Sequence, residues 1–268
     1  MGAGVFCSGG YRPGRPAMTD IQVGVSIGPY IDRIGGLPET FEFAEVAIGE
    51  GEVPLCDLDP GRIRDRLEQN GLGTTVHLPY RQPLSTPVSG IDEATLGYLE
   101  GALEVASELG AKTAVAHPSA RGSGHNHLAD RMEALSENAE SHGVTLCFET
   151  VGYAGGLSLD RVGELAADAG AAVCLDVGYA YLEAGTEGIE QFLGSYGDLV
   201  KHLHVHGARH RGDTHIPIGS GDVKYESLGP SISDVAPDTA TVEVFTDQVG
   251  YLTESAERFE DSVATSGP

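Results

Sequence analysis

Eight short apolar runs, most of them followed by a helical segment, constrain the fold of this chain more than any other feature. The runs are residues 21–27, 41–48, 74–79, 112–118, 144–151, 171–178, 199–207 and 239–245. Capped or amphipathic segments are predicted to be helices at 59–70, 92–109, 127–142, 158–169, 186–194 and 248–262. Because strands that alternate with helices pair in parallel, eight such units in 268 residues predict an α/β fold, a single-domain (β/α)8 TIM barrel.

An open, doubly wound sheet is the competing α/β architecture. Such a sheet usually has a Gly-rich dinucleotide loop after its first strand, but residues 26–36 read SIGPYIDRIGG and lack the GxGxxG order. Residues 1–17 are rich in Gly, Pro and Arg and show no periodicity, which predicts a disordered N-terminal extension. The barrel domain is therefore expected to span residues 18–268, with Met18 as a candidate natural start.

The chain is strongly acidic, with a formal net charge of −24 and only three lysines. This balance, spread over the whole chain, resembles that of proteins from halophiles. An acidic chain lacks the basic footprint that binds nucleic acid, although this argument against a DNA partner weakens in a salt-adapted protein. No apolar run approaches the length of a membrane span and no secretory signal opens the chain, so a soluble, cytoplasmic protein is expected.

Polar residues interrupt the apolar runs near the same end of most runs. They are Glu45, His77, His117, Glu149, Asp176, His204 and Glu243, with Asp213 and His215 just beyond the seventh run. The carboxyl ends of barrel strands ring one mouth, so these side chains are expected to converge on one cavity. Carboxylates crowded in a buried pocket repel one another unless a cation neutralises them. The pattern therefore predicts a divalent metal site, for which the strongest candidates are Glu149, Asp176, His204 and Glu243.

Half of the ten histidines lie between residues 200 and 222. His202, His204 and His206 alternate along a predicted strand and therefore point to one face. Of these, His204 is predicted to be a metal ligand, and His202, one pleat deeper, a residue that supports it. His206 is interpreted as substrate-facing or exposed, and Glu45 as an ordinary strand-end residue in contact with solvent.

Seven short segments together resemble the xylose isomerase-like superfamily, which includes endonuclease IV and sugar-phosphate isomerases and epimerases. They are VHLPY (76–80), AHPS (116–119), CFET (147–150), CLDVGYAYLEAG (174–185), HLHVHG (202–207), DTHIPIGSGD (213–222) and VEVF (242–245). Each segment is weak alone, but their order and spacing are specific. The resemblance extends from Ile21 to the end of the last predicted helix and implies the same TIM barrel fold.

In epimerases of this superfamily, one divalent ion, commonly manganese, magnesium or cobalt, is bound by four residues. The resemblance implies that the ligands in this chain are Glu149, Asp176, His204 and Glu243. It also implies that Glu149 and Glu243 act as the acid and the base on opposite faces of the substrate. A bound metal polarises a carbonyl and acidifies the adjacent C–H, which a carboxylate can then deprotonate.

Endonuclease IV uses the same positions and further ligands to bind three zinc ions. By resemblance, His77, His117 and Glu149 match the ligands of one zinc. Asp213 and His215 match two of the three protein ligands of another, but the position of the third, residue 179, is Tyr instead of His. The resemblance therefore implies one divalent ion (manganese, zinc, magnesium or cobalt) and leaves a second one open.

The sequence favours a metal-dependent isomerase or epimerase that acts on a sugar, a sugar phosphate or a related polyhydroxy carbonyl compound. The candidate substrate contacts are Tyr80, Tyr179, His206 and Arg209. The main alternative is an endonuclease IV-like zinc phosphodiesterase that acts on abasic-site DNA. A dehydratase or lyase stays open as well, because that reaction also begins with proton abstraction beside a carbonyl. The expected partner is a small carbohydrate, and no oligomeric state is predicted.

Overall fold

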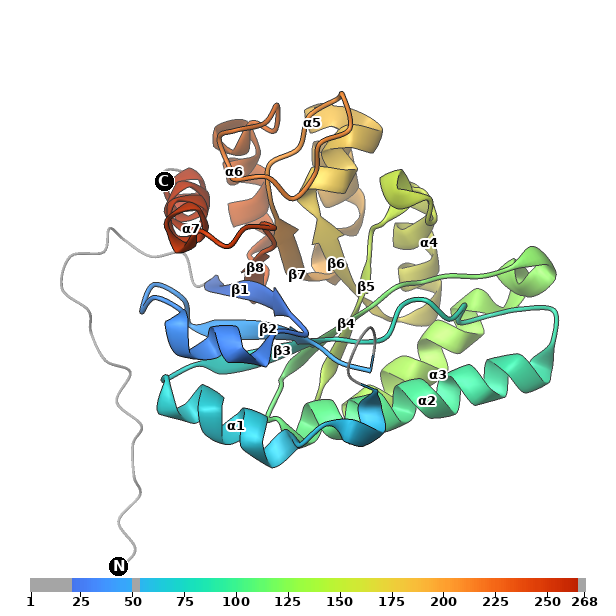
Figure 1. Cartoon of the computed structure of the whole chain (residues 1–268). Helices are drawn as coiled ribbons and strands as arrows, with labels where there is room; N and C mark the ends of the chain where they lie inside the picture. Colours follow the sequence, from blue (N-terminus) through green and yellow to red (C-terminus); the bar gives the residue numbers. More distant parts are fainter. Residues whose placement is uncertain (1–20, 50–53, 265–268) are drawn as a thin grey trace, which may run out of the picture.

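The computed structural model describes residues 21–49 and 54–264, and the predictions for residues 1–17 and Met18 lie outside these ranges. Eight parallel strands close into a barrel in chain order, and the last strand pairs with the first (Figure 1). The strands are β1 (Gln22–Gly28), β2 (Phe43–Ala47), β3 (Gly73–His77), β4 (Thr113–Ala116), β5 (Thr145–Glu149), β6 (Ala172–Asp176), β7 (Val200–Val205) and β8 (Thr239–Val242). The predicted TIM barrel fold is confirmed.

Helices surround the barrel as an outer layer (Figure 1). The α-helices of the described ranges are α1 (Pro60–Gln69), α2 (Ser89–Glu108), α3 (Leu128–Ser141), α4 (Leu159–Ala169), α5 (Val177–Tyr196), α6 (Tyr225–Val235) and α7 (Val249–Ala264). The connection from β1 to β2 has only a 3₁₀ helix, η1 (Ile31–Gly36). None of the helices in these ranges is long and apolar enough to cross a membrane.

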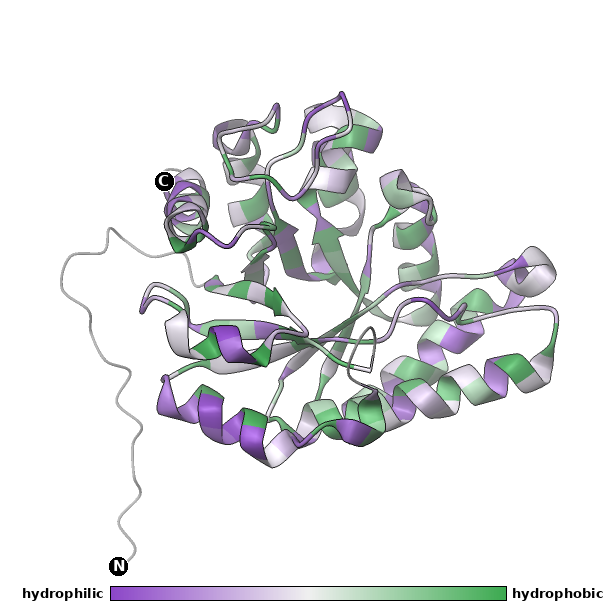
Figure 2. Cartoon of the chain, viewed as in Figure 1, coloured by the Kyte–Doolittle hydropathy of each residue, from purple (hydrophilic) through white to green (hydrophobic). Residues whose placement is uncertain are grey.

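Local chemistry sets where these helices begin and which face they bury. The Asp59 carboxylate accepts a hydrogen bond from the Arg62 backbone N–H at 3.0 Å, and Pro60 occupies the first turn, so α1 begins at this Asp-Pro pair. In α4, the apolar residues at helical spacing, such as Val162 and Leu165, are buried. Figure 2 shows the outcome, with apolar residues concentrated on the strands and hydrophilic residues on outer helices such as α1.

The start of α5 differs from the sequence prediction. The helix begins at Val177, directly after β6, because the Asp176 carboxylate accepts a hydrogen bond from the Tyr179 backbone N–H at 2.7 Å. The sequence predicts a helix only near residues 186–194. The part of α5 that the sequence does not predict ends at Gly185, whose φ of 70° produces a kink inside the helix. Asp176 is thus the last residue of β6, and its side chain caps α5 at the mouth of the barrel.

The sequence does not predict α6, because this helix contains Gly229 and Pro230, two poor helix formers. In the structure α6 packs against α7. Gly229 makes this close approach possible, since a Cβ at this position would overlap the carbonyl oxygen of Ser262. Tertiary packing therefore overrides the weak local propensity.

Gly229→Ala is expected to lower the free energy of unfolding by about 1–3 kcal/mol, because α6 and α7 must separate to accept the methyl group. Gly194→Ala is the matched control, since an added Cβ there would meet no other described part of the chain within 4 Å. That change should stabilise the protein by up to about 1 kcal/mol through helix propensity. Urea unfolding measures both variants, and equal stabilities would contradict the packing role of Gly229.

Candidate metal centre

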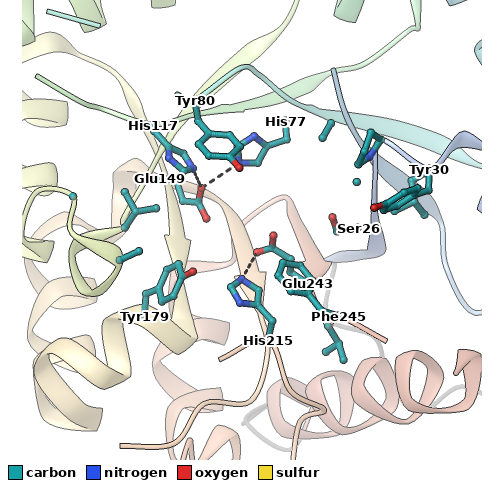
Figure 3. Close-up of a pocket in the computed structure, with 18 of the residues that line it drawn as sticks. Ser26, Tyr30, His77, Tyr80, His117, Glu149, Tyr179, His215, Glu243 and Phe245 are labelled. Carbon is teal, nitrogen blue, oxygen red and sulfur yellow. Dashed lines mark hydrogen bonds and ion pairs between the residues drawn. The ribbon is translucent and has the colours of Figure 1, made fainter. Parts of the chain in front are cut away.

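The carboxyl ends of the strands open into a cavity of about 810 Å³ (Figure 3). This volume is in the range that holds a small-molecule ligand. The predicted site residues that line it are His77, Tyr80, His117, Glu149, Tyr179, His215 and Glu243. They come from segments far apart in the sequence, so the barrel brings together what the strand-end pattern predicts to converge.

Four predicted metal ligands meet at the inner end of this cavity. Donor atoms from Glu149, Asp176, His204 and Glu243 all lie within 4.8 Å of one another. The Nδ1 atom of His204 is 2.6 Å from Glu149 Oε1 and 3.3 Å from Glu243 Oε2. The register of β6 and β7 places Asp176 beside His204. Three carboxylates and one imidazole form a donor set that suits manganese, magnesium, zinc or cobalt.

Charge explains how this group is held in a buried position. Burial raises the pKa of the Glu149 carboxyl, but His204 and His117 outweigh burial and hold that pKa well below its usual value. Burial lowers the pKa of His204, but Cys174 and the carboxylates Glu45, Glu149 and Glu243 outweigh it and hold that pKa well above its usual value. A protonated His204 thus offsets part of the carboxylate charge. A divalent ion would replace that proton with more positive charge, so the residues present fit such a metal.

A second group of donors shares Glu149. His117 Nε2 is 2.7 Å and His77 Nε2 is 3.3 Å from Glu149 Oε2 (Figure 3). The other carboxylate oxygen, Oε1, faces His204. Donor atoms of His77, His117 and Glu149 again lie within 4.8 Å of one another. Glu149 therefore lies between two neighbouring donor groups, which is the arrangement that a second ion would need.

A third group is formed by Asp176, His206 and His215. His206 is fully buried, so its interpretation as an exposed residue is wrong. Its Nε2 lies 3.1 Å from Asp176 Oδ1, and its ring stacks on that of His215 with centroids 4.2 Å apart. The His206 Nδ1 atom accepts a hydrogen bond from the His215 backbone N–H at 3.0 Å. His206 thus contacts the ligand candidate Asp176 and is not among the residues that line the cavity, and its contact with substrate stays a prediction.

Asp213 and Arg209 lie apart from these donor groups. The Asp213 carboxylate is 2.9 Å from Arg209 Nη1 and 2.8 Å from Arg211 Nε, and hydrogen bonds from these arginines lower its pKa. Arg209 also donates to the backbone carbonyl of Ser220. Within the described ranges, neither Asp213 nor Arg209 joins a donor group or lines the cavity. The loop after β7 therefore pairs Asp213 with arginines, and its role as a metal ligand beside His215 stays a prediction.

The interpretation of Glu45 is also wrong. It does not contact solvent at a strand end but lies within β2 and is only 1% exposed. Its Oε2 atom is 3.2 Å from His204 Nε2 and 3.3 Å from His202 Nε2. His202 is also fully buried, and with Cys174 and His204 it forms a further group of donor atoms. One sequence signal could have indicated that Glu45 is buried. Along the predicted strand, side chains alternate between two faces, and Glu45 is on the same face as Phe43 and Ala47.

The sequence missed the part of the cavity that is formed after β1 and β8. Tyr30, Arg33, Phe245 and Asp247 line it. Arg33 Nη2 is 2.6 Å from Asp247 Oδ1, and the Arg33 guanidinium lies 4.8 Å from the centroid of the Tyr30 ring. Phe245 is 72% exposed, and its ring stacks on His215 at 4.1 Å. Because loop residues follow no period, their spacing did not mark them as cavity residues.

Comparisons with known proteins agree with this architecture. A model of the xylose isomerase-like TIM barrel family matches residues 39–265. The uncharacterized protein MJ1614 of Methanocaldococcus jannaschii is 24% identical over 235 residues, which cover 80% of this chain and 89% of that protein.

Two solved structures are similar over most of their length. A D-tagatose 3-epimerase-like protein superposes with a TM-score of 0.77 at 17% identity, covering 92% of this chain and 98% of its own. D-psicose 3-epimerase from Clostridium cellulolyticum H10 gives a TM-score of 0.72 at 15% identity, with coverages of 91% and 99%. At these identities the likeness shows a shared fold. Because the family model matches residues 39–265, which are most of the sequence, the chain belongs to the xylose isomerase-like TIM barrel family.

Proposed function

We propose that this chain is a divalent-metal-dependent isomerase or epimerase that acts on a sugar, a sugar phosphate or a related polyhydroxy carbonyl compound. The observation that supports this most is the convergence of three carboxylates and one imidazole at the inner end of a cavity of small-molecule size. Of the two similar solved structures, one is a D-psicose 3-epimerase and the other is named a D-tagatose 3-epimerase-like protein, which supports a carbohydrate as the substrate.

The four ligand candidates would hold the ion, and a bound ion would polarise the substrate carbonyl and acidify the adjacent C–H bond. Glu149 and Glu243 approach His204 Nδ1 from β5 and from the end of β8, so their carboxylates face one point from different strands. One glutamate removes the proton from carbon, and the other delivers a proton to the opposite face, which inverts that carbon. Tyr80 and Tyr179 line the same cavity, which supports the proposal that they bind substrate hydroxyls.

Hydrogen exchange with solvent tests this function. The protein is loaded with Mn²⁺, Co²⁺, Mg²⁺ or Zn²⁺ and incubated in D₂O with ketoses, aldoses and their phosphates, at low and at high salt. We expect deuterium at the carbon beside the carbonyl, together with a new epimer or isomer, for at least one compound. Metal-bound protein that exchanges no proton in any compound would contradict the proposal, and loss of water or another group would indicate a lyase.

An endonuclease IV-like phosphodiesterase is the second candidate function. The group of His77, His117 and Glu149 beside the first donor group supports it, because two neighbouring ions suit the cleavage of a phosphodiester. Charge argues against it. Arg33 at the rim of the described cavity is paired with Asp247, which leaves little positive charge for a nucleic-acid backbone.

Replacing both His77 and His117 by alanine separates the two candidates. An epimerase with one ion should keep one equivalent of metal and lose about tenfold to a hundredfold in kcat/KM, because the two imidazoles contribute hydrogen bonds to Glu149. The control replaces the exposed His125 and His127 by alanine. Nicking of abasic-site DNA by the unchanged protein, lost only in the His77 and His117 variant, would support the phosphodiesterase instead.

The affinity for metal is expected to rise with pH. His204 has a pKa well above its ordinary value, so it is protonated at neutral pH in the metal-free protein and must release a proton to bind the ion. Below that raised pKa, the apparent association constant should grow about tenfold per pH unit, since one proton competes with the metal. Calorimetry between about pH 6 and 8, in buffers of different ionisation enthalpy, counts the released protons. A pH-independent affinity would contradict the role of His204.

A further inference from the structure

Glu45 is a buried carboxylate that the proposed reaction does not use. Four donor groups face its Oε2 atom: Thr75 Oγ1 at 3.3 Å, Thr241 Oγ1 at 3.2 Å, His202 Nε2 at 3.3 Å and His204 Nε2 at 3.2 Å. Its other oxygen, Oε1, has no hydrogen-bond partner among the described residues. A buried carboxylate costs free energy, and this one is satisfied on a single side. Two of its four contacts are with histidines of β7, and the other two are with threonine hydroxyls of β3 and β8.

His204 is the residue through which Glu45 reaches the metal-ligand candidates. The two nitrogens of its ring face in different directions. Nδ1 lies 2.6 Å from Glu149 Oε1, in the proposed metal centre, whereas Nε2 lies 3.2 Å from Glu45 Oε2, inside the barrel. The strand register places His204 beside Thr241, whose hydroxyl also donates to Glu45 at 3.2 Å. Glu45 therefore lies behind His204 as seen from the cavity.

The chemistry of the two groups decides where the ring proton lies. A neutral imidazole has one N–H, and a carboxylate can only accept a hydrogen bond. When His204 is neutral, its contact with Glu45 requires the proton on Nε2. The lone pair is then on Nδ1, which faces Glu149 and Glu243. The opposite tautomer would place two lone pairs, those of Nε2 and of Glu45, against each other in a buried space.

His202 holds Glu45 in this position. Its Nδ1 is 2.6 Å from Thr239 Oγ1, and its Nε2 is near both Glu45 Oε2 at 3.3 Å and Thr241 Oγ1 at 3.1 Å. The Thr239 hydroxyl can donate to Nδ1, so the Nε2 proton of His202 is directed at the carboxylate. His202 is fully buried, which leaves its ring little freedom to rotate.

We propose that Glu45 is a positioning residue that fixes the tautomer and the ring orientation of His204, so that Nδ1 is the atom offered to the metal. His202 in turn orients Glu45. This inference rests on the proposed metal-dependent function and adds to it a carboxylate that touches neither substrate nor ion. Carboxylates that orient a metal-binding histidine typically change metal affinity 10- to 100-fold when they are removed, so a loss of about that size is expected for Glu45→Gln.

The experiment compares the unchanged protein, Glu45→Gln and the control Thr75→Val. The control removes one donor to Glu45 but keeps the carboxylate and its contact with His204. Mn²⁺ and Co²⁺ affinities are measured against a competing chelator, and the unfolding midpoint of each metal-free protein is recorded. We expect about 10- to 100-fold weaker binding in Glu45→Gln and no more than about threefold in Thr75→Val. A purely structural role would change the midpoint without changing the affinity of the folded protein.

A second measurement needs no variant at Glu45. In the zinc-loaded protein with ¹⁵N-labelled histidine, NMR should show the His204 proton on Nε2, with the signal assigned by its loss in His204→Gln. A proton on Nδ1, or an unchanged affinity in folded Glu45→Gln, would overturn the positioning role of Glu45. Failure of the unchanged protein to bind any of these ions would instead overturn the proposed function, so the two failures are distinguishable.

Discussion

Replacing Glu149 by glutamine is expected to lower kcat/KM for isomerisation or epimerisation by about 10⁴-fold. The amide keeps the size of the side chain but cannot take a proton from carbon. Glu149 also faces both main donor groups, with Oε1 toward His204 and Oε2 toward His117, so the change weakens metal binding as well. Steady-state rates at saturating metal measure the effect. A loss smaller than about 100-fold would contradict a direct role in proton transfer.

Glu243→Gln should lower epimerisation to a similar extent but leave a diagnostic partial reaction. If each glutamate serves one face of the substrate, the remaining Glu149 can still remove a proton and return a solvent deuteron on its own face. In Glu243→Gln, deuterium should then enter one epimer without inversion of the carbon. In Glu149→Gln, deuterium should enter the other epimer, again without inversion. Glu254→Gln, at an exposed position paired with Arg258 in α7, is the control and should be fully active. Equal exchange into both epimers in either variant would contradict the two-face assignment.

The barrel itself was predictable from the sequence, because its local signals and its tertiary structure agree. Each strand reads as a short apolar run, as parallel strands buried on both faces do. The helices that were predicted have caps or stripes of their own, such as Asp59 before α1 and the buried stripe of α4. Where local signals were weak, the prediction failed. Gly229 and Pro230 weaken the helical signal of α6, whose helix is stabilised by packing against α7. Gly185 interrupts the helical signal of α5, and the cap that begins this helix is Asp176, a residue that the sequence assigns to a strand.

The convergence of site residues was predictable for the same reason, since parallel strands end at one mouth. The strand pattern and the family resemblance both predicted that Glu149, Asp176, His204 and Glu243 would lie together, as they do. The contacts of Glu45 and Asp213 were not predicted. Which donors meet depends on strand register, which sets Asp176 beside His204 and turns Glu45 inward toward His202. Asp213 lies in a loop, where two nearby arginines satisfy it. No periodicity describes such a loop, so spacing alone could not separate Asp213 from the residues that line the cavity.

Removing the metal is expected to abolish the activity and to lower the melting temperature by about 10 °C, while the barrel stays folded. A ligand at 1,000 times its dissociation constant stabilises a protein by about 4 kcal/mol. In a domain of this size, each kcal/mol shifts the melting temperature by about 2–4 °C. The fold should survive because protonated His204 offsets part of the charge of Glu149 and Glu243, as the raised pKa of this histidine indicates. Calorimetric melting with chelator and with excess Mn²⁺ measures the shift.

Asp176→Asn is the variant that separates metal loss from unfolding. Asparagine caps helices about as well as aspartate, so the hydrogen bond from the Tyr179 backbone N–H at the start of α5 can be kept. The negative charge that would bind the ion is lost, and with it the contact of a carboxylate with His206. The variant should therefore melt near the temperature of the metal-free protein and should show little further stabilisation by Mn²⁺. If Mn²⁺ stabilised it as much as the unchanged protein, Asp176 would not be a ligand, and the metal would be bound by donors that do not include it, such as Glu149, His204 and Glu243 or the group of His77, His117 and Glu149.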